Sequence, residues 1–137
     1  MKILFDCINV NKPDIDYKET SKWLQEVIAD NNKKIKEISI VFCNDDYLLE
    51  LNKKYLNHNF YTDIITFDYS KNNNISGDLI ISIDTVSYNA KKYNEEFNNE
   101  LNRVIIHGIL HLLGFDDKTE EQKIIIKEKE NYYLNFP

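Results

Sequence analysis

The spacing of hydrophobic and polar positions changes several times along the chain, and each change predicts a new element. Apolar residues alternate loosely over residues 2–10, as in a strand, and this run ends at the turn-forming residues 11–13. They then recur at helical spacing over residues 16–31, behind a capping-box pattern formed by Asp16 and Glu19. The chain therefore opens with a predicted strand and helix.

The rest of the chain gives seven further segments by the same criteria. Strands are predicted over residues 37–44, 63–69 and 76–84, and helices over residues 45–56, 84–93, 97–113 and 124–134. Asp84 is the expected cap of its helix, and Thr119 with Gln122 forms a second capping box before the last helix. We expect the last two strands to form a hairpin. Residues 1–137 are expected to form a single α+β domain, with about four strands packed on helices.

The segment over residues 104–113 stands out because it contains no charged side chain. Apart from Gly108, its only residues that are not apolar are His107 and His111. A helix of this composition is expected to be buried at the centre of the domain, and buried imidazoles need polar partners. Residues four apart project from one helix face, so both rings can reach the same metal ion.

Two residues after this helix complete a candidate metal site. Gly114 can end the helix and turn the chain back, which makes Asp117 the natural third ligand. Catalytic zinc sites typically have three protein ligands and keep one position for a water molecule. We therefore expect one Zn²⁺ per chain, held by His107, His111 and Asp117, with another divalent transition metal as the alternative.

Length, cysteine content and charge limit the class of protein. A chain of 137 residues can bury a core without disulfides or a structural metal, so a bound metal is expected to serve function. Cys7 and Cys43 lie in β-prone runs and are expected to be core thiols in a reducing compartment. No secretion signal or membrane-spanning stretch is visible, which indicates a cytoplasmic protein. The net charge of −6 argues against a surface that coats nucleic acid generally, although a local basic patch is compatible with it.

The histidine spacing also resembles the extended zinc-protease signature His-Glu-x-x-His-x-x-Gly-x-x-His. Gly114 falls where that signature has its Gly, but Gly108 occupies the place of the catalytic Glu. An ordinary metallopeptidase is therefore disfavoured. The small residue at 108 leaves room for either a phosphate or close packing against a strand, and the sequence does not separate these two explanations.

Residues 107–117 read His-Gly-Ile-Leu-His-Leu-Leu-Gly-Phe-Asp-Asp, which resembles the signature of the YbeY family of bacterial metal-dependent endoribonucleases. Further blocks agree in order with that family: Leu51-Asn52 with Tyr55, residues 62–67, residues 77–82, and Glu100-Leu101 with Arg103. The resemblance covers roughly residues 37–117. It implies a metal-dependent, single-strand-specific endoribonuclease that acts in ribosomal RNA maturation at the 16S 3′ end and in ribosome quality control.

The chain departs from this family at two positions. Asp117 stands where the family usually has a third His, and Leu56 stands where it has an Arg thought to handle substrate. An oxygen ligand at 117 still suits zinc but can shift metal preference. Losing an Arg removes a bidentate phosphate contact, because no other side chain presents the same planar fork.

Several other polar residues are candidates for substrate handling or proton transfer. The candidate phosphate contacts are Arg103, Lys53, Lys54 and His58; the alternative roles are an ion pair for Arg103, an exposed helix face for the lysines and a solvated loop for His58. Asp63 and Asp78 are candidates for orienting the metal ligands or for the general base, with turn or cap chemistry as the alternative.

The expected partner is ribosomal RNA or the small ribosomal subunit, with no membrane and no DNA. The oligomeric state is open, with a monomer expected. Two other functions stay in view: an assembly factor that binds the ribosome without catalysis and holds a structural metal, and a zinc peptidase-like hydrolase.

Overall fold

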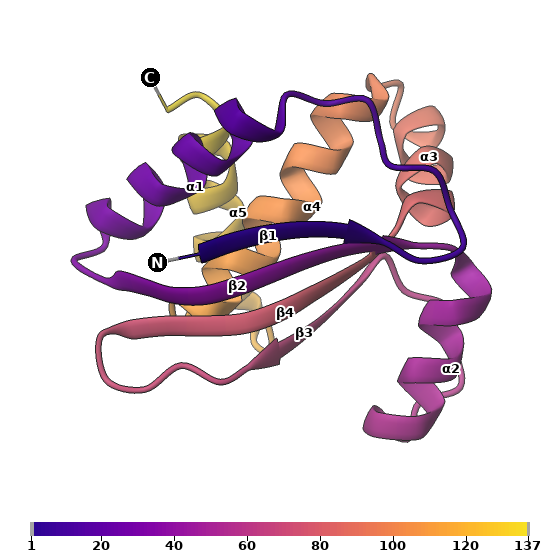
Figure 1. The fold of residues 1–137 in the computed structure, drawn as a ribbon, viewed down its shortest axis with the longest axis horizontal. Helices are drawn as coiled ribbons and strands as arrows, with labels where there is room; N and C mark the ends of the chain where they lie inside the picture. The colour runs from indigo at the N-terminus through magenta and orange to yellow at the C-terminus, as the bar shows by residue number, and fades with distance from the viewer. Residues whose placement is uncertain (1, 137) are drawn as a thin grey trace.

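A mixed four-stranded sheet lies at the centre of the molecule (Figure 1). The computed structural model describes residues 2–136. The strands are β1 (Lys2–Cys7), β2 (Lys34–Cys43), β3 (Ile64–Asp68) and β4 (Asn74–Ser82). Their order is β1-β2-β4-β3, with β1, β2 and β4 parallel and β3 antiparallel to β4. The predicted four-stranded α+β domain and the hairpin of β3 and β4 are confirmed.

Five helices cover this sheet unequally. They are α1 (Tyr17–Asp30), α2 (Asp45–Leu56), α3 (Ile83–Lys92), α4 (Phe97–Leu112) and α5 (Glu120–Leu134). The main core joins α1, α3, α4 and α5 to one face of the sheet, while a smaller core joins α2 to the other face. Figure 1 shows α1, α4 and α5 on one side of the strands and α2 on the other. None of the helices in residues 2–136 has the length and apolar composition to cross a bilayer.

The predicted central helix is α4, whose residues from Leu101 to Leu112 are largely buried. Gly108 is a residue at which α4 packs closely against the sheet. A Cβ atom there would lie 2.8 Å from Ile64 Cδ1 and 2.9 Å from Leu79 Cδ2. Of the two explanations that the sequence allows for Gly108, close packing against the strands is the one the structure supports.

Several predicted element ends differ from the structure, among them the starts of β2 at Lys34 and of α5 at Glu120. Local contacts explain two further differences. The helix α3 begins at Ile83 and is capped by Ser82, whose side chain accepts a hydrogen bond from the Thr85 amide, so Asp84 is not the cap. Asp84 instead accepts a hydrogen bond from the Asp45 amide at the start of α2. The strand β1 ends at Cys7, three residues earlier than its pattern suggests, because Asn9 adopts a positive φ.

The predicted caps of the first and last helices are confirmed. Asp16 accepts a hydrogen bond from the Glu19 amide, and Thr119 and Gln122 form a complete capping box. Both cysteines are free thiols, and Cys43 is fully buried, as expected of a core residue. Burial, with the nearby carboxylates of Asp45 and Asp84, raises the pKa of Cys43 to about 12, so its thiol stays protonated at neutral pH.

Candidate metal centre

The two histidines of α4 and the carboxylate of Asp117 meet at one point. The Nε2 atoms of His107 and His111 are 3.0 Å apart, and each lies 3.5 Å from Asp117 Oδ2. Two ligands of a tetrahedral zinc ion, bound at 2.0–2.2 Å, are about 3.3–3.6 Å apart. The two distances to Asp117 match those that a single zinc ion requires, and the distance between the two Nε2 atoms is slightly shorter. The donors are the nitrogen and oxygen types that zinc accepts.

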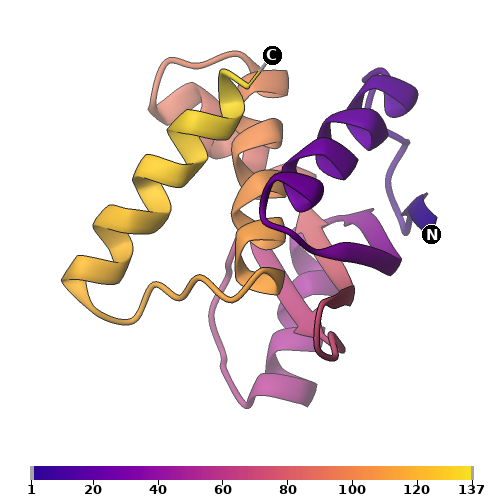
Figure 2. The same cartoon turned by 90° about the vertical axis from the view of Figure 1, so that its left-hand side faces the viewer.

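A helix-ending motif brings Asp117 to the histidines. Gly114 has a φ of +103° and donates its amide to the His111 carbonyl, while the Phe115 amide reaches back to the Leu110 carbonyl. This is the Schellman arrangement, which reverses the chain directly after a helix. Figure 2 shows the loop that follows α4 and leads into α5 alongside it. The glycine stop that the sequence suggests thus folds the carboxylate back onto the imidazoles.

The three candidate ligands line an open cavity of about 470 Å³. Its walls come from the end of α2, the loop after it, β3, α4 and the loop after α4. The lining residues are Leu56, Thr62, Asp63, Ile64, Ile65, Thr66, Asp68, His107, His111, Asp116 and Asp117. Four of these are carboxylates and none is Lys or Arg. The cavity therefore favours a cation and needs one to attract a phosphate group.

Asp63 is the carboxylate that the loop after α2 contributes to this cavity. Burial raises its pKa above the usual value, while the charge of His107 and two backbone hydrogen bonds act in the opposite direction. Asn52 helps to hold this loop, because its buried side-chain amide donates to the Phe60 carbonyl at 2.9 Å. A carboxyl group with a raised pKa beside a metal site is suited to proton transfer.

The two imidazoles have different surroundings. Burial alone lowers the pKa of His107, but the hydrogen bond and charge of Glu130, with Asp117 and Asp63, outweigh it and raise that pKa. Burial and the charge of His107 hold the pKa of His111 below its usual value. At neutral pH the His111 ring is therefore uncharged, the form that ligates metals.

Glu130 is the functional residue that sequence reasoning missed. Its Oε2 atom lies 2.6 Å from His107 Nδ1, and its side chain is almost completely buried. The position of Glu130 in the last helix could have pointed to this role. Glu130 lies four residues after Ile126 and three before Tyr133, on the only buried stripe of α5. A carboxylate on an otherwise apolar helix face requires a polar partner.

The other predicted site residues lie elsewhere. Arg103 contacts Glu130 and Asn131 and lines a different cavity, and the ion pair is the alternative that the sequence left open. Lys53 and Lys54 are exposed on α2, and His58 is exposed in the following loop, where it stacks on Phe60 with ring centroids 5.0 Å apart. None of the four lines the cavity of the two histidines.

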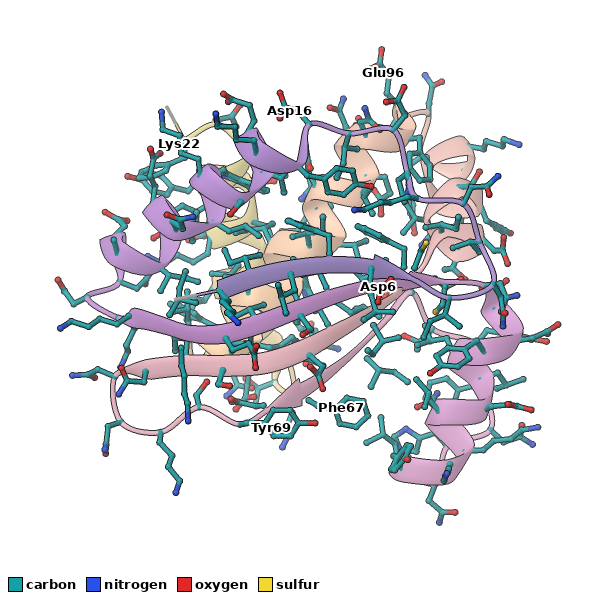
Figure 3. All side chains as sticks on the ribbon, viewed as in Figure 1. Asp6, Asp16, Lys22, Phe67, Tyr69 and Glu96 are labelled. Carbon is teal, nitrogen blue, oxygen red and sulfur yellow. The ribbon has the colours of Figure 1, made fainter. Side chains whose placement is uncertain are left out.

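Asp78 lies on the opposite face of the sheet from the histidines. Its neighbour Leu79 contacts α4, and side chains alternate along a strand, so Asp78 points away from α4. Its carboxylate accepts a hydrogen bond from the Tyr69 hydroxyl at 3.1 Å. Figure 3 shows Tyr69 and Phe67 projecting from the sheet on the side away from α1. The structure does not bring Asp78 to the site.

Comparison with known proteins gives consistent results over nearly the whole chain. A family described as Endoribonuclease YbeY matches residues 7–136. Endoribonuclease YbeY of Phocaeicola vulgatus is 50% identical over 132 residues, which are 96% of each protein. Endoribonuclease YbeY of Bacteroides thetaiotaomicron is 46% identical over 134 residues, which are 98% of each protein.

A solved structure has the same fold. The solution structure of TM1509 from Thermotoga maritima superposes with a TM-score of 0.72 at 25% sequence identity, covering 97% of this chain and 87% of TM1509. These matches speak against the zinc peptidase alternative. Together with the His-Gly-x-x-His helix and its candidate third ligand, they place the chain in the YbeY family of hydrolytic endoribonucleases.

Proposed function

We propose that this protein is a metal-dependent endoribonuclease that cleaves single-stranded RNA at the centre formed by His107, His111 and Asp117. The observation that carries the proposal is the triangle of donor atoms, 3.0 and 3.5 Å on its sides, in a cavity lined by carboxylates. Relatives that are about half identical over nearly their whole length are named endoribonucleases, which supports RNA as the substrate.

A zinc ion at this centre would supply a Lewis acid and a water molecule that is acidic enough to provide hydroxide near neutral pH. His107 and His111 hold their Nε2 atoms toward the same point, and Asp117 adds the oxygen donor. We assign proton transfer from the attacking water to Asp63, because its carboxyl group lines the same cavity and has a raised pKa. Asp116 keeps the cavity negative, so RNA phosphate enters only with a cation.

The proposal extends to the cellular role. The resemblance noted in the sequence supports a function in maturation of the 16S ribosomal RNA 3′ end and in ribosome quality control, in the cytoplasm, with the small ribosomal subunit as the partner. Zinc is the metal we propose, one ion per chain, because two imidazoles and one carboxylate match a catalytic zinc ligand set.

Cleavage of a single-stranded RNA that carries a 16S 3′ precursor sequence tests this function. We expect the purified protein to cut it, a chelator to stop the reaction, and added Zn²⁺ to restore it. His107→Ala should lower the rate at least about 100-fold, while the matched surface variant Glu128→Gln should not change it. Full cleavage by His107→Ala would refute the assignment.

One observation favours a second function. Leu56 lines the cavity in place of the expected Arg, and no Lys or Arg lines it among residues 2–136. A site of this kind can hold a metal without handling RNA phosphate well, as in a ribosome assembly factor. Complementation of a deletion strain separates the two functions, because the assembly factor would restore ribosome maturation equally well with His107→Ala.

A further inference from the structure

We infer that Glu130 and Arg103 form a positioning unit that fixes the orientation and tautomer of His107 for metal binding. This inference rests on the proposed metal centre and assigns to it two residues outside the ligand set. The structure places the two carboxylate oxygens of Glu130 on two different partners. Oε2 lies 2.6 Å from His107 Nδ1, and Oε1 lies 3.3 Å from an Arg103 guanidinium nitrogen.

The spacing on α4 makes this arrangement possible. Arg103 and His107 are four residues apart, so they project from the same face of the helix toward α5. Figure 2 shows α5 running beside α4, and Glu130 lies on the face of α5 that is buried against it. One carboxylate therefore bridges two consecutive turns of the helix that carries the metal ligands.

Burial explains why the unit needs both partners. Glu130 is 5% exposed, and an ionised carboxylate at such a depth must be both hydrogen-bonded and paired with a positive charge. The His107 ring supplies the hydrogen bond, while Arg103, which also contacts the Asn131 side chain at 3.1 Å, supplies the charge. Arg103 is thus occupied by this pair and lines a different cavity from the one that holds the histidines.

The consequence for His107 follows from the chemistry of imidazole. A neutral ring carries one N–H, and a carboxylate at Nδ1 keeps that hydrogen there. The Nε2 lone pair is then free and faces His111 Nε2 and Asp117 Oδ2. Carboxylates that hold a metal-binding histidine in this way also increase its basicity, and losing them typically weakens metal binding about 10–100-fold.

Zinc titration of the full-length protein against a chromophoric chelator tests this inference. We expect Glu130→Gln to weaken zinc binding about 10–100-fold, and the exposed Glu128→Gln on the same helix to leave it unchanged. The double variant Arg103→Gln with Glu130→Gln removes both charges of the pair, so it should regain thermal stability without regaining zinc affinity. Recovery of zinc affinity with stability would show that the pair is only structural and would overturn the inference.

A second readout needs no metal. The protein has three histidines, so long-range ¹H–¹⁵N spectra of the metal-free protein can resolve each imidazole. At a pH high enough for the His107 ring to be neutral, we expect it to carry its hydrogen on Nδ1 in the wild type and to become a mixture of tautomers in Glu130→Gln. If the wild type binds no zinc, the proposed metal centre fails, and the spectra alone decide whether Glu130 sets the His107 tautomer. Identical His107 signals in the two proteins would refute the positioning role.

Discussion

At the scale of single residues, the candidate centre combines donors that suit a metal with a wall that does not suit RNA phosphate. His107, His111 and Asp117 supply one nitrogen or oxygen donor each, but the surrounding cavity adds three more carboxylates. Leu56 is 41% exposed and lines this cavity from the end of α2. A single substitution at Leu56 is therefore the simplest way to change the affinity of the site for RNA phosphate.

Leu56→Arg is expected to lower the KM for single-stranded RNA. A hydrogen bond between a guanidinium and a phosphate contributes about 1.5–3 kcal/mol, which corresponds to at least a tenfold gain in kcat/KM. A cation at the C-terminal end of α2 also fits the helix dipole, so the fold should tolerate it. Steady-state cleavage measures the effect, with Leu56→Gln as the uncharged control. Equal KM values for the two variants would show that residue 56 does not contact the RNA phosphate.

At the scale of elements, the ends of helices and strands position the site. The Schellman turn after α4 places Asp117, and the loop after α2 places Asp63. Among residues 2–136, every non-glycine residue with a positive φ is an asparagine: Asn9, Asn32, Asn57, Asn72 and Asn94. Asparagine tolerates this conformation better than most residues, so these five asparagines serve the turns of the chain.

Gly114→Ala is expected to destabilise the protein by about 1–2 kcal/mol and to weaken zinc binding. No atom lies within 4 Å of a Cβ built at this position, so the cost comes from the φ of +103° and not from a clash. Relief of that strain would turn the loop and move Asp117 away from the histidines. Urea denaturation and zinc titration check both effects, with Gly114→Asn as a milder control. A loss of stability with unchanged zinc affinity would show that Asp117 does not depend on this turn.

The sequence predicted the elements well where the signal is local, and less well where it depends on distant contacts. Capping residues and apolar spacing act within a few residues, so α1, α2 and α4 were expected close to their observed bounds. The third ligand could be predicted because Gly114 lies between it and the histidines. Glu130 is 23 residues from His107, and only the packing of α5 on α4 joins them. For the same reason, the sequence could not show on which face of the sheet Asp78 lies.

At the scale of the whole molecule, the last helix, α5, contacts both α1 and the candidate metal centre. Near its start, α5 follows the loop that carries Asp117, and further along it supplies Glu130 to His107. Near its end, the Tyr133 hydroxyl donates to Asp30 at 2.7 Å and accepts a hydrogen bond from Asn31. Trp23 of α1 also donates to the Tyr133 carbonyl. Substitutions that disrupt the end of α5 should therefore disturb both the packing of α1 and the candidate metal centre.

The protein is expected to lose stability in alkaline solution. Burial and the hydrogen bond to Asp30 raise the pKa of Tyr133 to about 12, from 10.0, and burial raises that of Cys43 to about 12, from 9.0. Both groups ionise more readily in the unfolded chain, so their stabilisation is complete below pH 9 and is lost as the pH rises toward 12.

Urea denaturation at a series of pH values from 8 to 11.5 measures this loss. Tyr133→Phe should be less stable than the wild type at pH 8, and its stability should fall less steeply above pH 10. Parallel curves for the two proteins would contradict the account of Tyr133.

A crystal structure of the protein grown with zinc, with anomalous data collected on both sides of the zinc edge, tests the proposed metal centre. We expect one anomalous peak per chain, about 2.0–2.2 Å from His107 Nε2, His111 Nε2 and an Asp117 carboxylate oxygen. The absence of a peak between the two imidazoles, or an ion held by Asp116 in place of Asp117, would contradict it.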